Sequence, residues 1–222
     1  MSKEIIHTEE YKGYKINIHY SEADDSPDDW GDDNLFLVYD HRDFYIKREG
    51  FSPQDIYNYL FNKKTLEENN INELRDIPET NSITELECIY SDVIESEYED
   101  YYIFEVEAYI HSGISLSLFT GVKQCRWDSS VSGYILASKD EFKTIEEAKL
   151  RAEGLIETWN QYLDGSIYGF EVIKEDFCSH CSTTIEEFID SCGGYYGDYK
   201  KSGCLNEARA VIDNLTKEIV ND

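Results

Sequence analysis

Four of the six cysteines gather near the end of the chain, where thiolates could bind a metal ion. Cys178-Ser-His-Cys181 forms a C-x₂-C knuckle that contains His180, and Cys192 and Cys204 follow. Four thiolates are a common ligand set for structural Zn²⁺. Eleven residues separate the second pair, however, so the usual second knuckle is missing. Two interpretations stay open, which are a zinc site made of these four thiols and free thiols without a metal.

A second set of residues has the types needed for hydrolysis. His111, Ser112, Asp128 and Ser129 include the serine, histidine and carboxylate of a nucleophilic triad. The chain lacks the G-x-S-x-G turn that presents such a serine, and Asp128 and Ser129 are also residues typical of a turn. The glycine-rich motifs that bind nucleotide phosphates are absent as well.

Charge is the most unusual property of the sequence. The 222 residues carry 47 acids against 20 lysines and arginines, a formal net charge of −27. Such a charge repels nucleic acids and anionic membranes, and it favours either solubility alone or a basic partner. The N-terminal MSKEIIHTEE lacks the apolar region of a signal peptide, so we expect a cytoplasmic protein with reduced cysteines.

Two tracts contain acids without any lysine or arginine. Eight acids lie between Lys15 and Arg42, and eleven lie between Arg75 and Lys123. Most acidic proteins intersperse the two signs, because mixed charges reduce self-repulsion. Duplex DNA carries about one charge per 1.7 Å of its axis, so a folded surface of comparable density could occupy a nucleic-acid groove. The alternative is a solvated face without a partner. The predicted partner-binding residues are Asp24, Asp25, Asp28, Asp29, Asp32, Asp33, Asp92, Glu95, Glu97, Glu99 and Asp100.

Periodicity predicts the elements that position these residues. Alternating apolar residues indicate strands at 11–20, 35–40, 101–110 and 166–175, and a central hairpin is expected from 114–119 and 134–137. Apolar residues at helical spacing predict helices at 53–64, 82–97, 144–163 and 205–220. Residues 183–190 fit strand or helix, and 191–199 are expected to be a Gly/Tyr loop.

This order of elements predicts an α+β fold, a mainly antiparallel sheet with three to four packing helices. We expect one domain over residues 1–222, with a possible boundary or insertion near 63–82.

Several segments together resemble a family of small acidic proteins of phages and mobile elements of Gram-positive bacteria. The segments are YKGYKINIHY, SPDDW, HSGISLS with WDSSVSGYI, WNQYLDGSIYGFEV and DSCGGYYGDY. The chain differs from the family pattern at WDSSVSGY, where the family has WDSG followed by a VGF-like segment. The resemblance implies no catalytic residue, but it implies a setting in which genes often counter host defence.

The sequence therefore predicts a non-enzymatic inhibitor that mimics nucleic acid and binds the groove of a host defence nuclease, of the restriction or CRISPR type. No cofactor is expected on this interpretation. The alternative is a metal-binding or hydrolytic accessory enzyme that uses His111 and Asp128 or the cluster of Cys178 and Cys181.

Overall fold

A computed structural model describes residues 4–21, 26–30, 32–41, 44–77, 85–178, 180 and 183–221. These residues form four α-helices and two antiparallel sheets, which confirms the predicted α+β class. It divides into two compact units, one made of residues 1–29 and 157–222 and the other of residues 30–156. Neither division falls at 63–82, since that segment lies inside the second unit.

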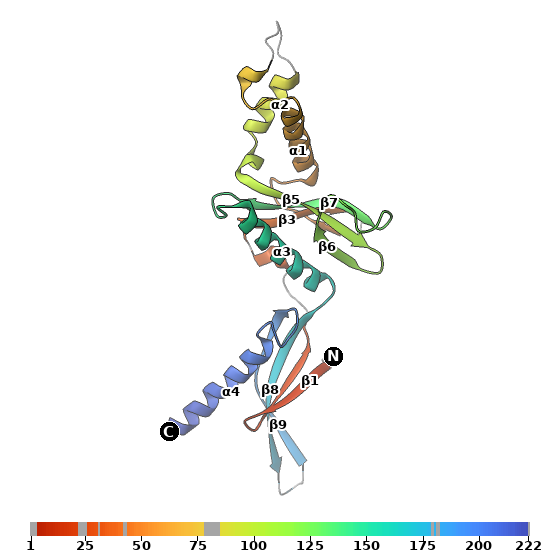
Figure 1. Ribbon diagram of the computed structural model, residues 1–222. Coiled ribbons are helices and arrows are strands. Elements are labelled where there is room, and N and C mark those ends of the chain that lie inside the picture. The colour runs from red at the N-terminus through yellow and green to blue at the C-terminus, as the bar shows by residue number, and fades with distance from the viewer. Residues whose placement is uncertain are drawn as a thin grey trace. The chain divides into compact units, whose positions relative to one another are not determined.

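The second unit is built on a five-stranded sheet (Figure 1). Its spatial order is β4-β3-β7-β5-β6, and every neighbouring pair is antiparallel. The strands are β3 (Leu35–His41), β4 (Phe44–Ile46), β5 (Tyr101–Ile110), β6 (Ile114–Leu118) and β7 (Ser129–Ser138). Strand β7 lies at the centre and is buried from Gly133 to Ala137, because both faces of the sheet are covered.

Helices α1 (Pro53–Glu68) and α2 (Glu85–Ile94) lie on one face of this sheet, and α3 (Ile145–Leu163) begins on the other (Figure 1). Helix α1 starts as predicted, because the Ser52 hydroxyl accepts the amide of Asp55 and Pro53 needs no hydrogen-bond acceptor at the first position. Ile56, Tyr59 and Leu66 of α1 belong to one hydrophobic cluster with Phe36 and Val38 of β3 and with Tyr134 and Leu136 of β7.

The expected hairpin of 114–119 and 134–137 is wrong in its pairing. Both segments are strands of one sheet, but each pairs with β5, which lies between them. Local alternation identifies a strand and its buried face, whereas the order of strands depends on contacts distant in sequence.

The first unit contains a four-stranded antiparallel sheet in the order β1-β2-β8-β9. Its strands are β1 (Ile5–Tyr11), β2 (Tyr14–Tyr20), β8 (Ile167–Cys178) and β9 (Thr183–Tyr196). Helix α4 (Cys204–Asn221) covers one face, where Leu205, Ala208 and Ile212 pack on Ile16 and Phe170. Each unit therefore has its own hydrophobic core.

Two segments of the first unit differ from the expectation. Residues 191–196 continue strand β9 instead of forming a loop, and register shifts in the β8–β9 ladder accommodate Gly193 and Gly194. Strand β1, with the sequence IIHTEEY, has no clean alternation and was not expected. In the described part of the chain, no helix is long and apolar enough to cross a membrane.

Candidate partner-binding surface

Two acids of the first tract and the end of the second tract's helical part lie at the same end of the five-stranded sheet. Asp32 and Asp33 immediately precede β3, and the short 3₁₀ helix η3 (Glu97–Asp100) immediately precedes β5. The first residue of β3 pairs with Ala137 of β7, and Tyr101, the first residue of β5, pairs with Ser138. Because Ala137 and Ser138 are adjacent, the acids that precede β3 and β5 lie on either side of the end of β7.

The phenol of Tyr101 lies within the field of acids from both tracts. Burial raises the pKa of Tyr101, and the charges of Glu97, Asp100 and Asp33 raise it further against the opposing charge of Arg48. The ring itself is held by edge contacts with Phe36 and Phe51. Carboxylates more than sixty positions apart in sequence thus act on one aromatic side chain.

Asp55, which lies outside both tracts, belongs to the same group. Burial raises the pKa of Tyr98, and the charges of Asp55 and Glu97 raise it further. Asp55 is exposed in the first turn of α1, where its carboxylate accepts the Ser52 hydroxyl at 2.6 Å. The capping sequence Ser52-Pro-Gln-Asp55 could have predicted that Asp55 lies in the first helical turn, because an acid is favoured at a helix N-terminus.

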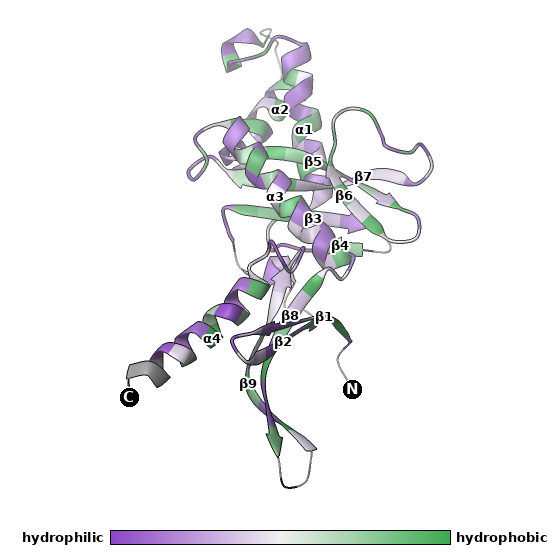
Figure 2. Cartoon of the chain, turned by 60° about the horizontal axis from the view of Figure 1, so that its bottom comes forward, coloured by the Kyte–Doolittle hydropathy of each residue, from purple (hydrophilic) through white to green (hydrophobic). Residues whose placement is uncertain are grey.

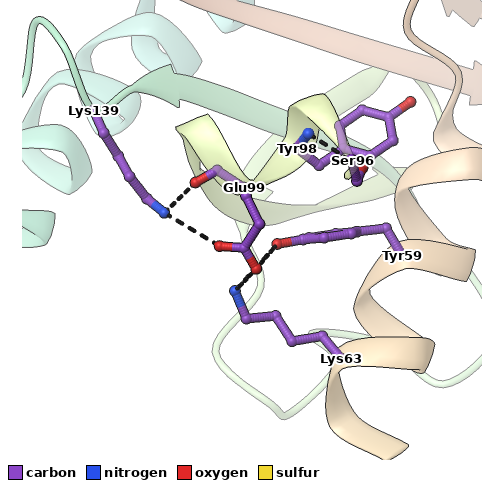
Figure 3. A network of polar contacts seen from close by, with 6 residues as sticks. All are labelled: Tyr59, Lys63, Ser96, Tyr98, Glu99 and Lys139. Atoms are coloured by element: carbon purple, nitrogen blue, oxygen red, sulfur yellow. Dashed lines mark hydrogen bonds and ion pairs between the residues drawn. The ribbon is translucent and has the colours of Figure 1, made fainter. Parts of the chain in front are cut away.

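Glu99 is held by hydrogen bonds and ion pairs within the protein (Figure 3). The Tyr59 hydroxyl donates to Glu99 Oε1 at 2.8 Å, and Lys63 Nζ donates to the same oxygen at 2.7 Å. Lys139 Nζ lies 3.8 Å from Glu99 Oε2 and also donates to the backbone carbonyl of Glu99. Burial opposes ionisation of Glu99, but these hydrogen bonds and charges outweigh it and hold the pKa of Glu99 below its ordinary value. Its charge is therefore compensated within the protein.

Asp33 is also paired, whereas several of its neighbours are not. Asp33 forms an ion pair with Arg48, whose guanidinium lies 4.6 Å from the centre of the Phe36 ring. Asp32 accepts the backbone amides of Asn34 and Leu35. Within the described part of the chain, no ion pair to a cation is found for four exposed acids, which we call the acidic sheet end: Asp32, Asp55, Glu97 and Asp100.

The remaining predicted acids take other positions. Asp92 and Glu95 are exposed at the end of α2 and just beyond it, directly before η3 in the chain. Asp28 and Asp29 lie in the 3₁₀ helix η1 (Pro27–Trp30) and belong to the first unit. Asp29 accepts both the amide and the hydroxyl of Ser26, which lowers the pKa of Asp29. Asp24 and Asp25 lie outside the described residues.

One acid of the second tract faces the interior. Glu107 is 2% exposed, and its Oε1 accepts the backbone amide of Gln124 at 3.0 Å. A β-bulge between Val106 and Glu107 accompanies this inward orientation. Glu107 therefore contributes nothing to an external acidic surface.

The strand ladder separates Cys178 from Cys192. Cys178 lies at the tip end of β8 opposite Thr183, whereas Cys192 lies opposite Phe170. Eight residues of extended strand between Phe170 and Cys178 span roughly 26 Å, and two thiolates on one zinc ion lie within about 5 Å of each other. A single site made of Cys178, Cys181, Cys192 and Cys204 is therefore wrong. Cys181 lies outside the described residues, and the described ones contain no cluster of three potential metal ligands.

The proposed triad residues are only partly brought together. His111 Nδ1 lies 3.9 Å from Asp128 Oδ2, which is beyond hydrogen-bond distance. Ser129 is buried and its hydroxyl accepts the amide of Cys125, while the Cys125 thiol donates to Asp128 at 3.5 Å. Asp128 and Ser129 thus make contacts within the turn before β7.

Comparisons of the chain with protein-family models, with curated proteins and with solved structures found no match.

Proposed function

We propose that this protein is an acidic inhibitor that imitates nucleic acid and occupies the DNA- or RNA-binding groove of a host defence nuclease. The acidic sheet end and the neighbouring Asp92 and Glu95 would meet the lysines and arginines that line such a groove. Complementary charge of this kind speeds encounter and makes binding sensitive to salt.

The observation that supports the proposal best is the arrangement around Tyr101. Asp33 from one tract and Glu97 and Asp100 from the other act on the same phenol, so acids distant in sequence share one region. Among the described residues, Lys63 and Lys139 are engaged with Glu99 and Arg48 with Asp33. The four acids of the acidic sheet end would therefore be available to a partner.

The setting follows from the same proposal. A protein that acts on an intracellular nuclease would work in the cytoplasm, and a phage or mobile element that meets restriction or CRISPR systems would benefit from carrying it. The resemblance of its segments to small acidic proteins of such elements fits this setting.

The test measures inhibition of purified restriction and CRISPR nucleases on fluorescent DNA, with binding followed between low and high salt. We expect binding that DNA competes away and that weakens steeply with salt. The double variant Glu97→Lys/Asp100→Lys should bind about tenfold or more weakly, because two favourable charge contacts become repulsive.

The control is Glu67→Lys/Glu153→Lys, which changes the net charge equally at exposed positions on α1 and α3. If both double variants weaken binding to the same extent, bulk charge and not this surface attracts the nuclease. The proposal fails if neither variant alters inhibition, or if no nuclease of either type is inhibited.

A further inference from the structure

The hairpin of β8 and β9 extends beyond the rest of its sheet. The last pair between β2 and β8 joins Lys15 and Ile173, but the β8–β9 ladder continues from Lys174–Glu187 to Cys178–Thr183. Figure 2 shows this arm passing the ends of β1 and β2, with a hydrophobic end to β8 near its tip. We call Lys174–Cys178 with Thr183–Phe188 the hairpin arm.

Strand β9 pairs with β8 alone, so its outer edge is open in the described structure. In β8 the carbonyl of Ile167 accepts the amide of Ser21, so odd-numbered residues of β8 direct their backbone groups toward β2. Even-numbered residues therefore bond β9, where Thr183, Ile185 and Glu187 face inward. The N–H and C=O groups of Thr184, Glu186 and Phe188 consequently point away from the sheet, as a row that another strand could pair with.

A pair of like charges lies across the hairpin arm. Glu175 and Glu186 are directly opposite, an arrangement that is unfavourable in antiparallel strands. Lys15 Nζ lies 2.7 Å from Glu175 Oε1, and Glu175 is the main cause that raises the pKa of Lys15, with a smaller effect of Glu186. Lys15 thus compensates Glu175 on the inner side, and among the described residues no ion pair is found for Glu186 on the outer strand. Glu187, by contrast, lies opposite Lys174 in the ladder, although Lys174 forms its ion pair with Asp176.

Apolar side chains accompany Glu186 on the same face. Phe188 pairs with Ile173 and Phe177 pairs with Thr184, so both phenylalanines share the face of Glu186. Phe177 is 68% exposed and Phe188 is 62% exposed. An exposed edge strand that carries apolar residues normally recruits a second strand unless charge prevents it.

We propose that the outer edge of β9 binds an extended segment of a basic partner protein as an added antiparallel strand, with a lysine or arginine opposite Glu186. Main-chain hydrogen bonds to Thr184, Glu186 and Phe188 would supply affinity, and the cation and an apolar residue near Phe188 would supply selectivity. A second copy fits poorly, because β9 contains Glu186, Glu187 and Asp190 but no lysine or arginine. This site lies in the first unit and is independent of the acidic sheet end.

The probe is a heptapeptide of alternating valine and lysine, with an alternating valine and glutamate peptide and a proline-interrupted lysine peptide as comparisons. Hydrogen exchange of the full chain, followed by NMR, reads the site directly. The lysine peptide should protect the amides of Thr184, Glu186 and Phe188, and should leave those of Ile185 and Glu187 unchanged because they are already bonded.

The variant Glu186→Lys should bind the lysine peptide about fivefold more weakly and should gain affinity for the glutamate peptide. Glu187→Lys is the matched control, since it changes net charge equally on the opposite face, beside Lys174, and should have a smaller effect. If the amides of residues 185 and 187 stay protected from hydrogen exchange in each variant, the hairpin is intact.

Three results would overturn the proposal. The first is binding without alternating protection, which indicates general charge attraction. The second is equal binding of the proline-interrupted peptide, which cannot form the ladder. The third is a concentration-dependent dimer that protects the same three amides without any peptide, which assigns the edge to a second copy.

Discussion

Carboxylates from one stretch of sequence lie in three different environments. Glu107 is buried against a backbone amide, Glu99 is held by two lysines and a tyrosine, and Glu97 is exposed without a cation among the described residues. The sequence shows them as equivalent members of one acidic tract. Their difference arises from lysines supplied by α1 and by the end of β7, which lie 36 and 40 residues away from Glu99.

Glu99→Gln should destabilise the protein by about 1–2 kcal/mol at neutral pH, because it removes the charge from hydrogen bonds with Lys63 and Tyr59. The pKa of Glu99 is depressed in the folded state, so its contribution is present above the ordinary value of 4.5 and is lost as pH falls through the folded pKa. Urea denaturation of both proteins between pH 7 and pH 3 measures this. If the difference in free energy of unfolding between the wild type and Glu99→Gln grew as the pH fell, it would contradict the role assigned to Glu99.

At the scale of elements, the sequence predicted those helices and strands whose formation depends on residues close by in the chain. The helices at 53–64, 144–163 and 205–220 and the strands near 35–40 and 101–110 follow from periodicity and from caps such as Ser52 and Thr144. The pairing of β6 and β7 with β5, and the strand at 191–196, could not be derived in this way. Both depend on partners that a local window does not contain.

The same limit applies to the candidate surface. The absence of cations from the two tracts indicated acids at a surface, but it could not show that Asp55 joins them or that Arg48 and Lys139 enter from elsewhere. The sequence shows how many acids a segment contains, whereas the fold decides which of those acids are paired with a lysine or arginine.

Strand β7 depends on a glycine at its centre. A Cβ atom at Gly133 would lie 2.3 Å from Tyr39 Cδ2 and 2.7 Å from the carbonyl oxygen of Val38. Gly133→Ala should therefore destabilise the protein by about 3 kcal/mol, because the backbone of β3 cannot move aside without breaking the ladder.

The control for that substitution is Gly154→Ala in α3, where an added Cβ meets nothing within 4 Å. Alanine should stabilise this helix position by about 1 kcal/mol. Denaturant unfolding of the two variants should move in opposite directions from the wild type. Similar midpoints for both would mean that Tyr39 rotates away easily.

At the scale of the whole molecule, two cores suggest two cooperative units. The clusters around Phe36 and Ile16 belong to different units, and the sequence expectation of one domain remains a prediction that unfolding can test. We expect two calorimetric transitions, of which Gly133→Ala lowers only one. A single transition that shifts as a whole with Gly133→Ala would support one cooperative domain.

The order in which the first unit is connected has a consequence for synthesis. Asn17 of β2 pairs with Glu171 of β8, so about 150 residues must be translated between the two partners. At about 5–20 residues per second, β2 emerges from the ribosome roughly 8–30 s before its partner strand β8. The intervening unit is continuous in sequence and can fold during that interval. Meanwhile β2 has only β1 as a strand partner, and its apolar face stays uncovered until α4 has been translated.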